Sequence, residues 1–271
     1  METKYLEIDS KIKIANFFEY SQNSNFGVVI IHGLAEHKGR YKEFIRQLLN
    51  NNISVFAMDI RGHGESTGRR GDVKYFKNYL SDLHAFISQI KEKHPELKLA
   101  IFGHSLGGLI ASAYACEYNT IDMLILSSPV LKVPAGLKIL KFIPYRWLGW
   151  MKIKKIHSES RKMLERSRND PLSCHYFSLR LVGNMFIDGV EYVMKRIKNI
   201  NASVLMLGGG LDPLVNSGFF EEVLEEFGSE DKTVRIYENK RHRMVQNENR
   251  DEIIAEIVEW IKRPNKVEMK N

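Results

Sequence analysis

Six short apolar segments recur along this chain, and each is continuous rather than alternating. They are GVVIIHG (27–33), SVFAMDI (54–60), LAIFGHS (99–105), DMLILSSP (122–129), SVLMLGGG (203–210) and TVRIYE (233–238). Continuous apolar runs of this length are typical of parallel strands that are covered on both faces. Apolar residues spaced three and four apart predict helices between and after these runs, at 41–51, 75–94, 106–118 and 249–263. The alternation predicts an α/β fold with a mostly parallel central sheet flanked by helices.

Two regions depart from this alternation. At the start, KYLEI (4–8) and KIKIANFFEY (11–20) flank an Asp-Ser turn and predict an antiparallel hairpin. Between about 133 and 198 the chain is basic, carries aromatic residues and lacks a good strand. We interpret this stretch as a helical lid over the carboxyl edge of the sheet, where open α/β sheets bind their ligands. The predicted parts are therefore a core (1–132), a helical cap or lid insertion (133–198) and a second core segment (199–271).

Length and composition favour a single globular domain over a membrane or secreted protein. A length of 271 residues suits one α/β domain. There is no apolar run of eighteen residues to span a membrane, and the polar N-terminus does not resemble a secretory signal. Only two cysteines occur, Cys116 and Cys174, which fits a reducing compartment better than a disulfide framework. We therefore expect a cytoplasmic protein, and its oligomeric state stays open.

The segment GHSLG (103–107) is the strongest sign of chemistry. It matches G-x-S-x-G, with an apolar strand before it and an apolar helix after it. A sharp strand-to-helix turn of this kind lifts the hydroxyl of Ser105 clear of the sheet and directs a helix N-terminus at developing negative charge. The alternative is a glycine-rich turn with an incidental serine, and the flanking strand and helix favour the nucleophile.

A serine nucleophile needs a base, and in this fold the chain order is serine, acid, histidine. The histidines that follow Ser105 are His157, His175 and His242. The first two fall in the predicted lid, whereas His242 follows the last strand, at the edge where the base must lie. The alternative is a surface histidine in a basic loop.

The acid should hold the tautomer of the histidine and stabilise its charged form. Asp212 directly follows the strand at 203–210 and precedes Pro213. Asp231 comes before the last strand and so lies at the wrong edge, and Asp170 and Asp188 belong to the lid region. The alternative for Asp212 is an ordinary turn-forming aspartate.

An oxyanion hole requires two backbone donors directed at one oxygen. Leu106, next to the nucleophile, is one candidate donor, and Leu34, after the strand at 27–33, is the other. The alternative for the second is that His32-Gly33 simply ends a strand. The fragment DIRGHGES (59–66) offers Asp59, His63 and Glu65 as metal ligands, but one histidine and two carboxylates are a weak pattern, and a structural loop is favoured.

Five segments occur in the same order as in a known family: HGLAEHKGRY (32–41), DIRGHGESTGRRG (59–71), GHSLGG (103–108), RNDPL (168–172) and GGGLDPLV (208–215). Over roughly 26–130 and 165–262 the chain resembles the monoacylglycerol lipase and lysophospholipase family of α/β-hydrolases. The resemblance implies catalytic Ser105, Asp212 and His242, with the oxyanion held by Leu34 and Leu106, and it implies no metal or organic cofactor.

The same resemblance places Glu36 and Arg40 at the polar end of the site, where the alcohol part of a substrate binds, and we include His104 among the substrate-binding residues. One departure concerns the rim of the site. Family members usually carry glycine or a small residue before the histidine, whereas Lys240 and Arg241 stand there in this chain.

The expected activity is hydrolysis of a carboxylic ester in a small single-chain glycerolipid, with monoacylglycerol as the first candidate and lysophospholipid as the second. A short-acyl esterase or a peptidase on the same fold is the enzymatic alternative. A binding protein that keeps the fold without the chemistry is the non-enzymatic alternative. Dehalogenases and epoxide hydrolases are disfavoured because both need a carboxylate in place of Ser105.

Positive charge is concentrated in the predicted lid. Residues 132–168 hold eleven Lys or Arg and two Glu, a net +9 against +7 for the whole chain, so the remainder carries −2. Trp147, Trp150 and aliphatic residues are interleaved with these cations, a combination that suits peripheral contact with an anionic membrane. The alternative is a solvated rim on residues that pack on the core. A nucleic-acid partner is not expected, because bulky aliphatic residues accompany the charge.

Overall fold

The computed structural model describes residues 2–22, 24–154, 165, 167–247 and 249–263. Within these residues one eight-stranded sheet has the order β1-β2-β4-β3-β5-β6-β9-β10. The strands are β1 (Lys4–Glu7), β2 (Lys13–Glu19), β3 (Phe26–Ile31), β4 (Ser54–Met58), β5 (Lys98–His104), β6 (Met123–Ser127), β9 (Ser203–Gly209) and β10 (Lys232–Tyr237). All pairs from β4 to β10 are parallel, and β1 and β2 add an antiparallel hairpin. The predicted mostly parallel sheet is confirmed.

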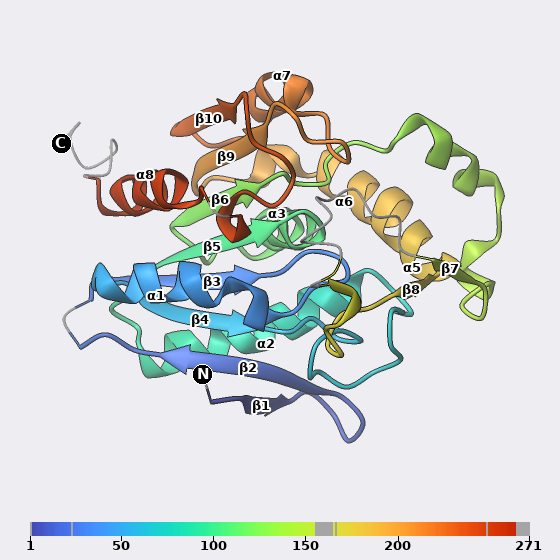
Figure 1. The fold of residues 1–271 in the computed structure, drawn as a ribbon, viewed down its shortest axis with the longest axis horizontal. Helices are drawn as coiled ribbons and strands as arrows, with labels where there is room; N and C mark the ends of the chain where they lie inside the picture. Colours follow the sequence, from blue (N-terminus) through green and yellow to red (C-terminus); the bar gives the residue numbers. More distant parts are fainter. Residues whose placement is uncertain (1, 23, 155–164, 166, 248, 264–271) are drawn as a thin grey trace.

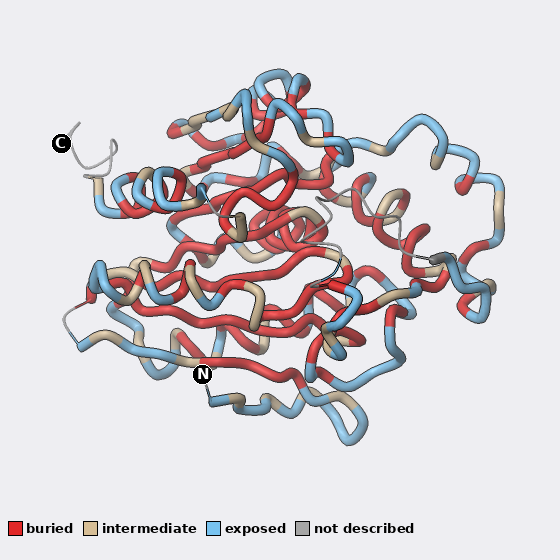
Figure 2. Tube along the Cα trace, viewed as in Figure 1, coloured by how far each residue is buried: buried red, intermediate tan, exposed pale blue. Residues whose placement is uncertain are grey.

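Helices cover both faces of this sheet (Figure 1). They include α1 (Lys42–Asn50), α2 (Lys77–Lys93), α3 (Leu106–Tyr118) and α8 (Asp251–Lys262). Alternate residues of β3 point to opposite sides: Val29 joins the buried cluster of α2 and α3, and Val28 joins that of α1 and α8. This double burial explains why the strands read as continuous apolar runs, and Figure 2 shows the central strands of the sheet buried.

The segment between β6 and β9 lies beyond the carboxyl ends of the parallel strands, at the right of Figure 1. It contains 3-10 turns at Ala135–Phe142, Tyr145–Trp147 and Ile197–Asn199, strands β7 (Lys152–Lys154) and β8 (Tyr176–Ser178), helix α5 (Leu179–Gly183), a π-helical turn at Asn184–Gly189 and helix α6 (Val190–Met194). Figure 2 shows that the part before β7 is largely exposed. The location fits the predicted cap, whose boundaries and motion as a lid stay predictions.

Two details of the sequence interpretation were wrong. The stretch 133–198 contains strands, because β7 and β8 pair as a small antiparallel sheet. Each has three residues, too few to show a period, and their pairing joins segments distant in the chain. Helix α7 (Phe220–Glu225), between β9 and β10, was also missed, since six residues give less than two helical turns. His157 and the rest of 155–164 lie outside the described residues.

Neither a disulfide nor a membrane-spanning helix occurs in the described part of the chain. Cys116 and Cys174 are both buried free thiols. No described helix combines the length and the apolar character needed to cross a bilayer.

Candidate active site

Ser105 occupies the turn between β5 and α3 with φ 53° and ψ −114°. An L-residue rarely adopts this backbone conformation, which costs on the order of 1–3 kcal/mol and persists only where its surroundings impose it. The Ser105 N–H donates to the Ser127 carbonyl (2.9 Å), and the Ser105 carbonyl accepts from the amides of Leu109 (3.2 Å) and Val130 (3.3 Å). The turn is therefore fixed on both sides of the serine.

The glycines of GHSLG allow the backbone to approach closely around this turn. A Cβ on Gly107 would lie 2.2 Å from the carbonyl oxygen of Ile31 in β3, and one on Gly103 would lie 2.5 Å from the carbonyl oxygen of Gly107. Both distances are shorter than any tolerable contact with a methyl group. The two glycines thus bring the start of α3 against the end of β3, which places Ser105 at the carboxyl edge.

The structure brings Asp212 and His242 together at the same edge. His242 Nδ1 lies 2.7 Å from Asp212 Oδ2, while Asp212 Oδ1 accepts from the amides of Leu214 (2.8 Å) and Val215 (3.1 Å). Burial alone would raise the pKa of Asp212, but the hydrogen bond and the charge of His242 hold that pKa below its usual value. The aspartate is therefore ionised at neutral pH and fixes which ring nitrogen of His242 carries hydrogen.

Backbone contacts hold the loops of this acid and base side by side. The Leu211 amide donates to the Lys240 carbonyl (3.0 Å), and the Gly210 amide donates to the Tyr237 carbonyl (2.9 Å). Lys240 Nζ donates to the carbonyl of Asn249 (2.6 Å). The contacts of Lys240 thus link the loop before His242 to the acid loop and to the start of α8.

The loop after β3 lies against the nucleophile. Its turn closes through the Glu36 amide donating to the Gly33 carbonyl (3.2 Å), which leaves the Leu34 amide outside the hydrogen bond of the turn, and Ala35 takes φ 71°. A Cβ on Gly33 would stand 3.2 Å from Cβ of Ser105. Leu106, as the first residue of α3, has an amide with no carbonyl partner one turn earlier in its helix. Oxyanion binding by these two amides stays a prediction.

The ring of His32 forms hydrogen bonds that hold the same loop. Its Nε2 accepts from the Ile60 amide (3.1 Å), so Nδ1 carries the hydrogen and donates to the Gly33 carbonyl (2.8 Å). Burial lowers the pKa of His32, which keeps the ring neutral in this tautomer. The ring therefore orients the Gly33–Leu34 peptide.

All three predicted substrate-binding residues contact other side chains of the protein. Arg40 Nη2 lies 2.7 Å from Asp170 Oδ2 and 3.0 Å from Ser173 Oγ. His104 is buried; its ring centroid lies 4.7 Å from that of His242, and burial lowers its pKa to about 4. Their contact with substrate stays a prediction.

Glu36, the third of these residues, is only 2% exposed, and its Oε1 lies 2.7 Å from Nε of Arg243. The sequence interpretation missed Arg243, although a basic residue directly after the candidate base was a signal.

The fragment that offered metal ligands contains an ion-pair network. The ammonium group of Lys38 lies 3.0 Å from Asp59 Oδ2 and also contacts the carboxylate of Glu65. The Lys38 amide donates to Asp59 Oδ1 (2.6 Å). His63 is buried beside His32, at 5.7 Å between ring centroids. The described residues contain no group of three or more His, Cys, Asp or Glu placed to hold a metal ion.

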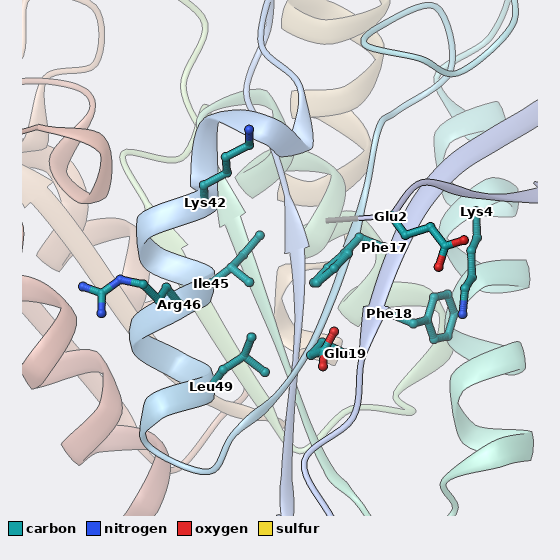
Figure 3. A pocket seen from close by; sticks show the side chains of 9 residues that line it. All are labelled: Glu2, Lys4, Phe17, Phe18, Glu19, Lys42, Ile45, Arg46 and Leu49. Atoms are coloured by element: carbon teal, nitrogen blue, oxygen red, sulfur yellow. The ribbon is translucent and has the colours of Figure 1, made fainter.

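A separate pocket of about 560 Å³ opens between β2 and α1 (Figure 3). Phe17 from β2 and Ile45 from α1 point toward one another across it, and Lys42 and Arg46 lie along α1, with Arg46 pointing away from the pocket. None of the candidate site residues lines this pocket. Its charged groups do not converge on a common point, so the geometry gives it no catalytic role.

Comparison with known proteins identifies relatives of this chain. The family model described as serine aminopeptidase, S33, matches residues 22–250. Rattus norvegicus monoglyceride lipase is 29% identical over 267 residues, covering 93% of this chain and 88% of that protein. Homo sapiens monoglyceride lipase is 30% identical over 226 residues, covering 79% and 74%. The crystal structure of Paleococcus ferrophilus monoacylglycerol lipase superposes with a TM-score of 0.77 at 28% identity, covering 93% of this chain and 98% of that one.

Proposed function

The chain belongs to the serine aminopeptidase S33 family of α/β-hydrolases, and from this premise we propose that Ser105, His242 and Asp212 hydrolyse the ester of a single-chain glycerolipid. Monoglyceride lipases of similar length are among its relatives, and the chain is a serine hydrolase of the lipase and esterase kind. The observation that carries the proposal is the buried Asp212–His242 hydrogen bond of 2.7 Å at the edge where the strained Ser105 turn ends β5.

The proposed mechanism is acyl transfer in two steps. With Nδ1–H of His242 donated to Asp212, Nε2 is left to take the proton of Ser105 as its oxygen attacks the ester carbonyl. The amides of Leu34 and Leu106 hold the oxyanion, and the strained turn keeps the Leu106 amide and the hydroxyl in fixed relation. The alcohol leaves with the proton from His242, and water then cleaves the acyl-enzyme by the same route.

Apolar side chains near the carboxyl edge favour a lipid substrate. Leu211 and Leu214, on either side of Asp212, are 59% and 47% exposed, and Phe142 in the insertion is 88% exposed. Large apolar groups left in water from two separate segments suit an acyl chain better than a peptide. Monoacylglycerol is the first candidate substrate, lysophospholipid the second, and a short-acyl ester the third.

A panel of p-nitrophenyl esters from two to sixteen carbons, with monoacylglycerol and lysophosphatidylcholine, tests this assignment for wild type and Ser105→Ala. We expect turnover that rises toward medium or long chains and vanishes in the variant. Activity confined to the shortest esters would replace the lipase assignment with a small-acyl esterase. No activity on any ester would favour a binding protein.

We also propose that the insertion rests on an anionic membrane surface while the site takes a lipid from it. Trp147 and Trp150 are 84% and 69% exposed, and exposed cations, Lys138, Lys141 and Lys152, lie along the same segment. Indole rings with flanking cations are the side chains that favour the headgroup region of a bilayer.

Sedimentation with vesicles of anionic phospholipid at low salt measures this contact. We expect wild type to sediment and the variant Trp147→Ser/Trp150→Ser to stay in solution. The matched control replaces two half-exposed aromatic residues elsewhere, Tyr5 and Tyr75, by serine and should sediment like wild type. Equal sedimentation of both double variants would remove the tryptophans from the interface.

A further inference from the structure

The carboxylate of Glu36 is the shared partner of three loops. Oε2 accepts from the Gly33 amide (3.2 Å), the Tyr41 hydroxyl (2.7 Å) and Gln246 Nε2 (3.1 Å). Oε1 lies 2.7 Å from Nε of Arg243 and 3.9 Å from Nε2 of His104. Burial alone would raise the pKa of Glu36, but the charge of Arg243 holds that pKa well below its usual range, so the group is an anion.

These contacts connect the candidate catalytic loops directly. Gly33 precedes the proposed oxyanion donor Leu34, Arg243 follows the proposed base His242, and His104 precedes the proposed nucleophile Ser105. Arg243 is 6% exposed, so both charges of the pair are out of water. The backbone contacts described above fix the acid loop to the histidine loop, whereas Glu36 and Arg243 join the histidine loop to the oxyanion loop.

The same contacts argue against Glu36 as a ligand for the alcohol of a substrate. Both of its oxygens already contact protein donors, and its side chain is 2% exposed. A substrate hydroxyl would have to displace the guanidinium of Arg243 or the hydroxyl of Tyr41. Stability alone does not explain the pair either, because replacing a buried ion pair by apolar groups is often neutral or stabilising.

We propose that Glu36 and Arg243 form a positioning pair that holds the oxyanion loop and the histidine loop in catalytic register. The proposal rests on the proposed function and assigns Glu36 to this task in place of substrate binding. The pair carries no net charge, so it sets geometry beside His242 without adding a net field. A displacement of about 1 Å in such a loop lowers turnover by up to about 100-fold.

A double-mutant cycle tests the pair: Glu36→Gln, Arg243→Met and both together. Either single change removes one charge of the buried pair and keeps the other, so both should lower the melting temperature. The double variant removes both charges and should recover much of that temperature. We expect its kcat for a p-nitrophenyl ester to stay at least tenfold below wild type, with KM within about threefold, because the loops have lost register while the acyl site is intact.

Two further variants keep the test decisive. Arg243→Lys retains the charge but not the planar fork of the guanidinium, so it should fold and still lose kcat. Glu43→Gln/Arg46→Met removes a comparable pair from the surface of α1 (side chains 33% and 60% exposed) and should leave kcat and melting temperature unchanged.

End-point labelling with a serine-reactive fluorophosphonate gives the fraction of competent sites, against which every kcat is normalised. If wild type is not labelled, the proposed function fails, and with it any catalytic role of the pair. If wild type is labelled and either the double variant or Arg243→Lys turns over at the wild-type rate per labelled site, the positioning role alone is overturned and the pair is structural.

Discussion

Strain at a single residue marks the reactive position of this chain. Ser105 has φ 53° and ψ −114°, whereas glycine at the same position would be unstrained. We expect Ser105→Ala to lower ester hydrolysis by at least about 10⁴-fold and to keep the fold. Ser112→Ala, which removes a buried hydroxyl in the same helix, should retain wild-type kcat. Activity surviving in Ser105→Ala would assign the nucleophile elsewhere.

The backbone strain at Ser105 predicts that two inactive variants differ in stability. Ser105→Gly should be more stable than Ser105→Ala, because alanine keeps the Cβ clash that glycine relieves. The gain is about 1 kcal/mol, since the larger entropy of glycine in the unfolded chain offsets part of the relief. Urea unfolding of both variants measures it. Equal midpoints would mean that the turn relaxes when the hydroxyl is lost.

Buried His63 predicts loss of stability in acid. Burial lowers its pKa to about 3, against about 6.5 in an unfolded chain. The folded ring stays neutral while the unfolded one takes up a proton, so its contribution is complete above pH 6.5 and is lost as the pH falls toward 3. The slope is about 1.4 kcal/mol per pH unit. Chemical denaturation of wild type and His63→Asn between pH 7 and 4 should show a shallower slope in the variant, and parallel curves would contradict the argument.

The sequence could place the three proposed catalytic residues at one edge because each follows a strand end, and parallel strands bring their carboxyl ends together. Asp212 and His242 meet for this reason, although 30 residues separate them. The pairing of Glu36 with Arg243 follows no such rule. A basic residue directly after His242 indicated a charged group near the base, but its partner depends on how two loops fold over each other.

At the scale of elements, the close packing of α3 on β3 depends on Gly107. A Cβ there would meet the Ile31 carbonyl oxygen at 2.2 Å, and backbone cannot move aside as a side chain can. We expect Gly107→Ala to lower the free energy of unfolding by about 2–3 kcal/mol or more. Gly136→Ala is the matched control, because nothing lies within 4 Å of its added methyl group. A destabilisation that is no larger at Gly107 than at Gly136 would contradict this packing.

Some of the helices and strands could be predicted from the sequence, and others could not. The strands of the central sheet could be predicted because a strand that is buried on both faces needs an unbroken run of apolar residues, as in β3 and β5. Strands β7 and β8 have only three residues each, too few to show a pattern, and their pairing depends on contacts between segments that are distant in the chain. Helix α7 is similar: Phe220, Val223 and Leu224 form a helical stripe, but one too short to recognise.

At the scale of the whole molecule, charge and exposed apolar surface lie on the same side. The insertion lies beyond the carboxyl edge of the sheet (Figure 1), and it holds Phe142, Trp147 and Trp150, three of the most exposed large apolar residues described. The exposed cations Lys138, Lys141 and Lys152 lie along the same segment. The proposed orientation, with the edge of the sheet toward a membrane, therefore also brings these exposed cations toward it.

Because the proposed membrane contact is the insertion, we expect binding to anionic vesicles to depend on where the cations lie and not on the net charge of the chain. Reversing Lys138, Lys141 and Lys152 to glutamate should weaken binding at least tenfold, because each cation near such a surface contributes about 1 kcal/mol. Reversing Lys4, Lys93 and Lys262 changes the net charge equally, but these residues lie on the N-terminal hairpin and in the last turns of α2 and α8. That variant should keep most of its binding, since a Debye length of about 10 Å at 0.1 M salt screens distant charges. Vesicle sedimentation across a salt series compares them, and equal loss in both variants would show that the insertion does not face the membrane.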